Sequence, residues 1–343
     1  MATLRDVAEQ ASVSVATASR VLNGSKPNHP VSSEVRAAVR AAAEALGYMP
    51  SAAAQALQQQ RSKIIGVIAS DILDPYFAEM TRGIEIEASG QGFVTMLANA
   101  NRDPAQESTK FRVLREHQAS GIVFCGSDID GAPGTARLAR EVTAAARHGT
   151  KVVALAPRGF EATKIVVDNA ATAYDLTGYL LSLGHRDIAF VGGIPGLTAA
   201  EQRITGYQAA MRERGLTPRS PIANGMSQES GRVAIGQLLA GSDLPTAVIC
   251  TNDEVAVGAL AYLWRRGLRV PEDISVAGIG GTRAATTFDM TTMTLPLMEL
   301  GRLAARHIVA TETGTEVPEP PPCTLRVGTT TAPRGMGGGP EQK

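Results

Sequence analysis

The stretch Thr3–Asn23, TLRDVAEQASVSVATASRVLN, predicts two short helices separated by a tight turn. The apolar residues of its first part recur at helical spacing and would form one inward face: Leu4, Val7, Ala8 and Ala11. Thr3 is placed to cap this helix, because its hydroxyl can accept from an amide of the first turn, with Asp6 completing a capping pair. A polar break, Ser12-Val13-Ser14, follows.

Ser14 would cap the second helix. The predicted inward stripe of this helix is Val15, Ala18, Val21 and Leu22. Its outward face is small and rich in hydroxyl groups: Ala16, Thr17, Ser19, Arg20 and Asn23. Such a face suits close approach to a DNA major groove, so the pattern predicts a helix-turn-helix. The alternative is an ordinary three-helix unit whose polar residues only face solvent.

A third amphipathic segment begins at Ser32 or Ser33 and ends at Gly47, and Tyr48-Met49-Pro50-Ser51-Ala52-Ala53-Ala54-Gln55-Ala56-Leu57 follows it. In this order the motifs resemble the LacI/GalR family of transcriptional regulators, whose headpiece reads V-S-x-x-T-V-S-R-V-L-N, then V-S, then G-Y-x-P-N-x-x-A-x-x-L. The resemblance implies a DNA-binding headpiece over residues 1–50. Pattern and resemblance together predict DNA contacts from Thr3, Leu4, Ser14, Val15, Ala16, Thr17, Ser19, Arg20, Asn23, Ser32, Tyr48, Ser51, Ala54 and Leu57.

Residues 51–62 correspond to the hinge helix of the family, which folds on the operator and inserts a leucine into the minor groove. Residues 51–60 are rich in Ala and Gln and would be marginal as an isolated helix. By position, Ala54 and Leu57 match the hinge alanine and the wedge leucine, and Ser51 replaces the usual asparagine. Inserting Leu57 would unstack a base step and bend the DNA. The alternative is that Leu57 packs against the core domain.

Two positions in the headpiece differ from the family pattern. Ser12 stands where the family mostly carries glycine in the turn, so a positive φ there would cost about 1 kcal/mol relative to glycine. The loop Gly24–Pro30 is about two residues longer than usual by comparison with the family. Lys26 or His29 in it could add a phosphate contact, or the loop could simply be solvated.

Composition limits the remaining possibilities. The chain has 343 residues, 44% of them hydrophobic, with a formal net charge of +0, so the bulk charge predicts no polyanionic partner. Through Lys63, seven basic residues outnumber four acidic ones, a local excess consistent with a DNA-facing end. Three scattered cysteines, Cys125, Cys250 and Cys323, predict buried thiols and neither a disulfide framework nor a metal site.

No leader segment and no apolar run of membrane-spanning length is apparent, so we expect a cytoplasmic protein without membrane contact. No glycine-rich phosphate-binding motif follows any predicted strand, so no nucleotide cofactor is expected.

From Ile64 onward, short apolar runs alternate with helical periods. The runs predict buried strands at Ile64–Ala69, Phe93–Leu97, Gly121–Cys125, Val152–Leu155, Ile188–Val191, Ala247–Cys250 and Ile274–Gly278. The intervening helices are expected over residues 77–89, 170–183 and 254–266. This alternation indicates parallel sheets covered by helices on both faces, and about ten strands favour two lobes. The predicted fold is an N-terminal all-α headpiece followed, over residues 63–331, by an α/β core of two doubly wound lobes.

The family resemblance continues through the core. Its landmarks are Asp74-Pro75-Tyr76-Phe77-Ala78-Glu79, Val167-Asp168-Asn169, Gly184-His185-Arg186-Asp187-Ile188-Ala189, Arg203-Ile204-Thr205-Gly206-Tyr207, Thr251-Asn252-Asp253 and Gly267–Val276. They imply two periplasmic-binding-protein-like lobes with an effector cleft between them, contacted by Tyr76, Phe77, Arg203, Asn252 and Asp253. The alternatives are that Tyr76 and Phe77 pack their helix on the sheet and that Asp253 caps a helix.

The cleft also departs from the family pattern. Where sugar-binding members carry an aromatic residue followed by two aspartates, this chain has Ile279-Gly280-Gly281, so the acid that grips sugar hydroxyls is replaced by Gly280. Pro157 stands where an Asp-Arg pair usually begins, and Leu197 and Ala199 occupy a segment that often supplies polar contacts. An unpaired buried hydroxyl costs about 1–3 kcal/mol, so a simple neutral sugar is not the expected effector. The alternatives are an anionic effector, a more apolar one, or loss of small-molecule control.

Residues 332–343 are rich in Gly and Pro, predict a disordered tail, and lack the leucine heptads of a tetramerising coiled coil. The expected state is therefore a homodimer. We predict a repressor that binds a double-stranded, pseudo-palindromic operator under the control of a small-molecule effector. A solute-binding protein with the same core is the alternative, and no catalytic constellation among the five histidines favours an enzyme.

Overall fold

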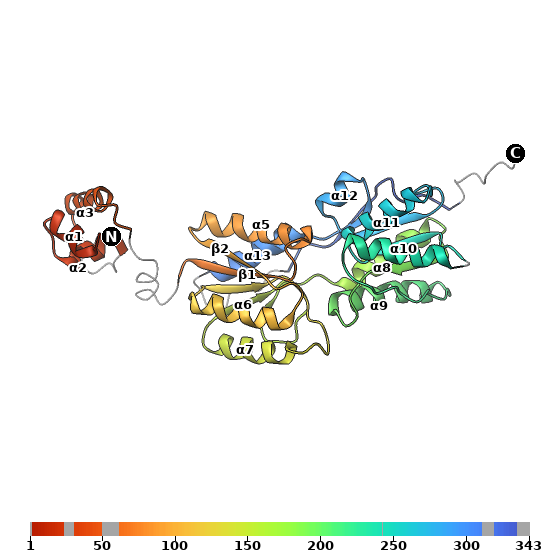
Figure 1. Ribbon diagram of the computed structural model, residues 1–343, viewed down its shortest axis with the longest axis horizontal. Coiled ribbons are helices and arrows are strands. Elements are labelled where there is room, and N and C mark those ends of the chain that lie inside the picture. The colour runs from red at the N-terminus through yellow and green to blue at the C-terminus, as the bar shows by residue number, and fades with distance from the viewer. Residues whose placement is uncertain (1, 24–30, 50–61, 242, 311–318, 335–343) are drawn as a thin grey trace. The chain divides into compact units, whose positions relative to one another are not determined.

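The computed structural model describes residues 2–23, 31–49, 62–241, 243–310 and 319–334 (Figure 1). The chain divides into two units, Met1–Lys63 and Ile64–Lys343, and each is described by itself. The predicted hinge residues Ser51, Ala54 and Leu57, and the loop residues Lys26 and His29, lie outside the described residues.

The first unit contains three helices, α1 (Leu4–Gln10), α2 (Val15–Asn23) and α3 (Ser33–Ala45). The predicted caps of α1, α2 and α3 are confirmed. Asp6 N donates to Thr3 Oγ1 at 3.3 Å and Thr3 N donates to Asp6 Oδ2 at 2.8 Å, which forms a capping box. Ser14 Oγ accepts from Thr17 N at 3.1 Å, and Ser32 Oγ accepts from Val35 N at 3.3 Å. The buried core of the unit is Val7, Ala8, Ala18, Val21, Val39, Ala42 and Ala43.

Val15 does not belong to the inward stripe of α2, and that prediction is wrong. Its side chain is 44% exposed, whereas Ala18 and Val21 are buried. Helix α2 is short and buries only the arc that passes through Ala18 and Val21, and Val15 stands at its open first position. Exposure at this position is compatible with the predicted DNA contact of Val15.

Ser12 has φ +54°, the left-handed conformation that glycine adopts without strain. We expect Ser12→Gly to stabilise the first unit by about 1 kcal/mol, since it removes this strain. The matched variant Ser14→Ala should destabilise the unit by about 1 kcal/mol, because it removes the cap of α2. Hydrogen exchange of peptides from residues 2–23, followed by mass spectrometry, measures both. Equal protection in Ser12→Gly and the unaltered protein would contradict the strain at this turn.

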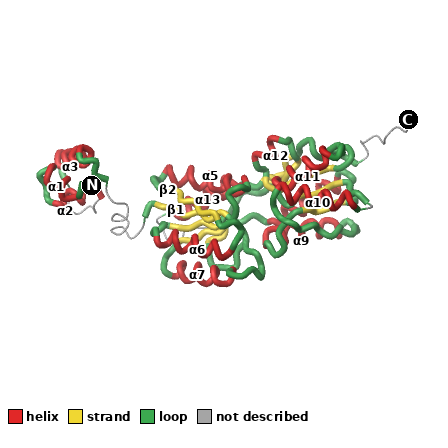
Figure 2. The backbone as a smooth tube through the Cα atoms, in the orientation of Figure 1, coloured by secondary structure: helices red, strands yellow, loops and turns green. Residues whose placement is uncertain are grey.

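The second unit contains two lobes, each built on a five-stranded sheet with helices on both faces (Figure 2). The sheet of the first lobe has the order β2-β1-β3-β4-β5, and all its strand pairs are parallel. Its strands are β1 (Ile64–Ala69), β2 (Val94–Asn99), β3 (Gly121–Phe124), β4 (Lys151–Ala154) and β5 (Thr163–Lys164). Its helices are α5 (Pro75–Gly90), α6 (Pro104–Glu116), α7 (Thr135–Arg147) and, from much later in the chain, α13 (Leu297–Val309).

The sheet of the second lobe has the order β10-β9-β8-β7-β6. Its strands are β6 (Ile188–Val191), β7 (Ala247–Cys250), β8 (Ser275–Gly280), β9 (Thr291–Thr294) and β10 (Thr324–Arg326). Its helices are α8 (Asn169–Ser182), α9 (Thr198–Glu213), α10 (Gln228–Ala240), α11 (Asp253–Arg265) and α12 (Arg283–Thr287). Strand β10 pairs antiparallel with β9, so the expectation of an entirely parallel sheet is wrong at this edge.

The seven predicted strands are found within two residues of their expected bounds, and one of them differs in burial. Strand β2 lies at the edge of its sheet, where Val94 is 66% and Leu97 is 47% exposed. An edge strand has a neighbour on one side only, so an apolar sequence does not guarantee burial.

Helix α13 returns to the first lobe and packs closely on α5. A Cβ atom at Gly83 of α5 would lie 2.0 Å from the carbonyl oxygen of Met298, and one at Gly301 of α13 would lie 2.1 Å from that of Met80. Glycine at both positions therefore permits the backbones of the two helices to touch. The first lobe is completed by a segment more than 130 residues after β5.

The chain end that the sequence assigns to a disordered tail is partly held in place. The carbonyl oxygen of Ala332 lies 3.1 Å from His185 Nε2, and Arg334 N donates to the carbonyl oxygen of Leu183 at 2.9 Å. For residues 332–334 the prediction of disorder is therefore wrong, because these two contacts attach them to the second lobe. Residues 335–343 lie outside the described residues.

Cys125 and Cys250 are buried free thiols, as predicted, and Cys323 is half-buried. Burial raises the pKa of Cys125 to about 12. Within the described ranges, no helix is both long enough and apolar enough to cross a membrane.

Candidate effector pocket and DNA-facing helix

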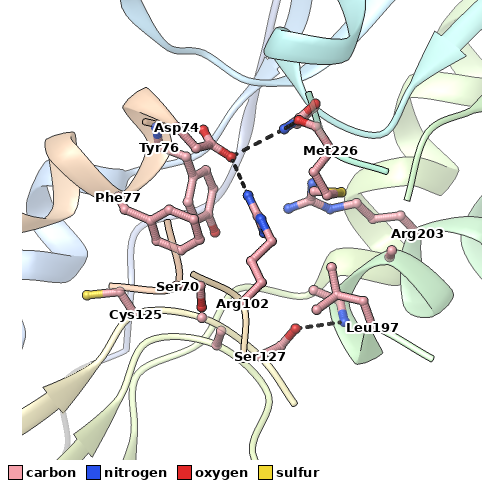
Figure 3. Close-up of a pocket in the computed structure, with 15 residues that line it drawn as sticks. Ser70, Asp74, Tyr76, Phe77, Arg102, Cys125, Ser127, Leu197, Arg203 and Met226 are labelled. Atoms are coloured by element: carbon pink, nitrogen blue, oxygen red, sulfur yellow. Dashed lines mark hydrogen bonds and ion pairs between the residues drawn. The ribbon is translucent and has the colours of Figure 1, made fainter. Parts of the chain in front are cut away.

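A pocket of about 480 Å³, part of it open to solvent, lies between the two lobes of the second unit. Tyr76 and Phe77 enter it from one side, and Leu197 and Arg203 enter it from the other (Figure 3). The full lining is Ser70, Asp74, Tyr76, Phe77, Arg102, Cys125, Gly126, Ser127, Ala156, Leu197, Ala199, Ala200, Arg203, Met226 and Asn252. Much of this lining follows the carboxyl ends of parallel strands, where ligands of such sheets bind.

Asp74 organises the first-lobe side of the pocket. It is the N-cap of α5, where Oδ1 accepts from Tyr76 N at 3.1 Å. Its other oxygen, Oδ2, accepts from Arg102 Nη2 at 3.1 Å (Figure 3) and from Asn252 Nδ2 at 3.4 Å. Burial raises the pKa of the Asp74 carboxyl, and the charge of Arg102 opposes that rise. Both carboxylate oxygens are therefore engaged by the protein.

The two aromatic side chains have different roles. Phe77 is buried beneath the pocket, and the Arg102 guanidinium lies 5.5 Å from the centre of its ring. Tyr76 is half-buried, and its ring meets that of Phe77 edge to face, with centroids 5.2 Å apart. Burial raises the pKa of Tyr76 to about 12, so its hydroxyl group stays protonated at neutral pH. Phe77 thus also packs its helix, as the alternative reading of the sequence held.

Arg203 comes from α9 and is 4% exposed. Its Nε donates to Asn169 Oδ1 at 2.9 Å, and its Nη1 donates to the carbonyl oxygen of Thr251 at 2.5 Å. Both partners are neutral. None of the ion pairs found within the described ranges involves Arg203, so no described carboxylate forms an ion pair with this buried guanidinium.

Asn252 is the N-cap of α11, so the alternative interpretation that Asp253 caps this helix is wrong. Its Oδ1 accepts from Val255 N at 2.9 Å, and its Nδ2 donates to the carbonyl oxygen of Met226 at 3.0 Å and to Asp74 at 3.4 Å. Asn252 therefore lines the pocket and joins the two lobes.

Asp253 was predicted to contact the effector, but it is not part of the pocket lining. Its carboxylate is fully buried and accepts from Thr282 N at 2.8 Å, Thr282 Oγ1 at 2.9 Å and Thr292 Oγ1 at 2.7 Å. Burial raises its pKa, against those hydrogen bonds. Asp253 thus anchors the loop after β8, because its side chain turns into the lobe and not into the cleft.

The buried carboxylate of Asp253 explains why position 280 carries glycine and not an acid. A Cβ atom at position 280 would lie 2.8 Å from Asp253 Oδ2, and the φ of Gly280 is +155°. An aspartate at this position would therefore be crowded and would face a like charge. Leu197 and Ala199, the apolar residues in a segment that often supplies polar contacts in the family, line the pocket.

The lobes are in direct contact at two further places. At the first, Asp130 N donates to the carbonyl oxygen of Gly196 at 2.8 Å, and Thr198 N donates to that of Asp128 at 3.0 Å. At the second, Arg283 N donates to Glu79 Oε1 at 3.1 Å, and burial raises the pKa of Glu79. The lobes are thus closed against each other.

Sequence reasoning did not identify several lining residues, among them Arg102, Ser127 and Met226. Arg102 follows the end of β2 and Ser127 follows the end of β3, so the rule for strand carboxyl ends could have located these two. Met226 lies in an irregular segment before α10, and no local pattern marks it.

The predicted DNA-facing residues lie on the surface of the first unit to different extents. Thr3, Ser14, Val15, Ala16 and Ser32 are exposed, and Leu4, Thr17, Ser19, Arg20 and Tyr48 are half-buried. Thr17 Oγ1 lies 2.9 Å from Ser14 Oγ, so the two hydroxyl groups are hydrogen-bonded to each other at the start of α2. Tyr48 packs against the apolar core of the unit.

Comparison with known proteins identifies both units. Residues 3–51 match the model for bacterial regulatory proteins of the lacI family, and residues 177–335 match a periplasmic binding protein-like domain. The HTH-type transcriptional repressor PurR of Pectobacterium atrosepticum is 34% identical over 310 residues, which cover 89% of this chain and 88% of the relative. The chain belongs to the lacI family.

Other members of the family agree. The HTH-type transcriptional repressor CytR of Escherichia coli K12 is 32% identical over 88% of this chain and 87% of its own length. The lac repressor dimer, bound to operator and the anti-inducer ONPF, has a TM-score of 0.83 at 26% identity and covers 96% of this chain and 99% of its own. These matches confirm the predicted fold and a DNA-binding transcriptional repressor with a ligand-binding domain, and these lacI-family relatives are regulators and not enzymes.

Proposed function

We propose that this lacI-family repressor binds a pseudo-palindromic operator as a homodimer and that a small molecule in the interlobe pocket changes its operator affinity. The observation that carries the proposal is the pocket itself, which lies between two lobes in direct contact and is lined by Tyr76, Phe77, Arg203 and Asn252. A ligand there contacts both lobes, so it would bind their open and closed arrangements with different affinity. Such a difference is what couples an effector site to a distant function.

The test of the DNA-binding part is recovery of genomic fragments by the purified protein, followed by sequencing and salt titration of the enriched site. We expect one palindromic motif with a high ratio of specific to nonspecific binding. Uniform recovery of fragments, both alone and with a metabolite extract, would contradict the proposal. A repressor of this kind acts in the cytoplasm, where its operator lies.

Arg20→Ala should weaken specific operator binding by about 1–3 kcal/mol if Arg20 contacts a guanine edge. Arg40→Ala is the matched control, since Arg40 is exposed on α3, outside the helix-turn-helix. Fluorescence anisotropy on the recovered motif and on its base-substituted variants measures both proteins. An equal loss of affinity for the motif and for its base-substituted variants would indicate that Arg20 contacts the phosphate backbone. Unchanged affinity for both would show that Arg20 does not contact the DNA.

Leu57 lies outside the described residues and is proposed as the minor-groove wedge only from its place in the sequence. Leu57→Ala should lower operator affinity and reduce the bend of the DNA, because the base step is no longer opened. Circular-permutation gel shifts measure the bend. Unchanged affinity together with an unchanged bend would eliminate the wedge.

The proposed homodimer needs an apolar contact surface, and the second lobe has one. Trp264 at the end of α11 is 46% exposed and Phe288 after α12 is 40% exposed, with their ring centroids 6.2 Å apart. Exposed apolar residues of the neighbouring β10 edge are Leu325 and Val327. Clustered aromatic residues of this kind favour an interface between subunits.

The effector is proposed not to be a simple neutral sugar. Gly280 cannot be exchanged for an acid without crowding Asp253, and Leu197 and Ala199 present apolar groups to the pocket. A polyol would find few partners there, and its unpaired hydroxyl groups would lower its affinity.

A further inference from the structure

Each carboxylate and carboxamide oxygen of the pocket wall already accepts at least one hydrogen bond from the protein. Both oxygens of Asp74 accept hydrogen bonds, from Tyr76 N on one side and from Arg102 and Asn252 on the other. The side-chain oxygen of Asn252 accepts from Val255 N. These are the only carboxylate and carboxamide side chains on the described lining. A ligand that donates several hydrogen bonds would have to share these oxygens with the protein or use the hydroxyl groups of Ser70 and Ser127.

Hydrogen-bond donors, in contrast, remain available. The described part of the chain offers Arg203 two neutral acceptors and no carboxylate, although its side chain is almost fully buried. Its Nη2 group makes no hydrogen bond within the described ranges. The protonated Tyr76 hydroxyl likewise has no partner among the described residues, and both side chains line the pocket. The second cation of the lining, Arg102, is already paired with Asp74 at 3.1 Å.

Much of the remaining wall is apolar. Its members come from both lobes: Phe77, Cys125, Ala156, Leu197, Ala199, Ala200 and Met226. A complementary molecule therefore has an apolar body and one anionic, accepting end.

We propose that the effector is a small monocarboxylate with an apolar body, whose carboxylate pairs with Arg203 and accepts from Tyr76 while its body lies against Leu197 and Met226. The inference rests on the proposed function of the pocket. A buried guanidinium without a counter-ion is costly, and a planar carboxylate matches its two-donor edge. A single unpaired cation and apolar walls favour one carboxylate over a more highly charged phosphate.

The experiment is titration calorimetry on the full-length protein at neutral pH with three carboxylates and their amides: benzoate and benzamide, phenylacetate and phenylacetamide, hexanoate and hexanamide. Each amide keeps the shape of its acid and removes the charge. We expect at least one acid to bind roughly 10- to 100-fold more tightly than its own amide, the range of a charged hydrogen bond. Equal binding of acid and amide, tighter binding of a neutral hexose, or no binding of any acid would overturn the proposal.

Variants test whether the charge of Arg203 causes the preference for the acid over its amide. Arg203→Met should abolish the preference for the acid, and Arg203→Lys should keep part of it. Arg219→Met is the matched control, because that guanidinium pairs with Asp187 at 2.5 Å and is not part of the pocket lining. If Arg203→Met does not fold, the ratio of the affinities for acid and amide in the unaltered protein still tests whether the pocket prefers a carboxylate. A preference that survives in folded Arg203→Met would refute the assignment.

The test of the carboxylate effector can fail or succeed independently of the test of operator binding. Recovery of one operator motif with no carboxylate bound would leave the repressor in place and eliminate this class of effector. Carboxylate binding without recovery of any motif, with or without the ligand, would preserve the pocket assignment and reject DNA control.

Discussion

Replacing Arg158 with methionine should lower the free energy of unfolding of the second unit by about 3–5 kcal/mol. Arg158 is buried, and its two terminal nitrogens each donate to Glu107 at 2.7 Å, while Nη1 also donates to Asp128 at 3.0 Å. Burial disfavours its charge, but Glu107 and Asp128 outweigh that effect and raise the pKa of Arg158. Methionine fills much of the volume and leaves two buried carboxylates without a cation.

Urea unfolding followed by Trp264 fluorescence measures this loss. The control is Arg219→Met, whose ion pair with Asp187 is partly exposed and screened by solvent, so that its removal should cost far less. A triple variant, Arg158→Met with Glu107→Gln and Asp128→Asn, should recover part of the stability because both uncompensated charges are gone. A loss below about 1 kcal/mol in Arg158→Met would show that the carboxylates are not left uncompensated.

Replacing Phe288 with aspartate should convert the proposed dimer to monomers and weaken operator binding by about 10²- to 10⁴-fold. This is the range gained when two linked modules bind together. Phe288 is 40% exposed beside Trp264, so the introduced charge would be desolvated within the proposed interface. Sedimentation velocity measures the oligomeric state, and anisotropy on the recovered operator measures the affinity.

The matched control is Val113→Asp. Val113 on α6 is likewise 40% exposed and apolar, but it belongs to the other lobe and is far from the Trp264 cluster in sequence. This variant should remain dimeric and bind the operator normally. A dimeric Phe288→Asp protein would exclude the Trp264–Phe288 surface from the contact, and monomers with full affinity would exclude cooperation between two headpieces.

Much of this protein follows from the sequence by itself. The helix-turn-helix could be located because Thr3, Ser14 and Ser32 mark helix starts by local chemistry that needs no tertiary contact. The strands of the core could be located because buried parallel strands require continuous apolar runs. The strain at Ser12 was indicated by comparison with the family, which mostly carries glycine at this turn position, and the positive φ of Ser12 agrees with it.

Long-range packing decided the rest. The burial of Asp253, the return of α13 to the first lobe and the antiparallel edge strand β10 depend on segments that are distant in sequence. The partners of the Arg203 guanidinium also depend on segments that are distant in sequence. The sequence predicted an effector contact there, but only the tertiary structure leaves its guanidinium without a carboxylate while Arg102 is paired with Asp74. Local patterns determine which side chains a strand or helix presents, whereas the partner that each charge meets depends on how segments distant in sequence pack together.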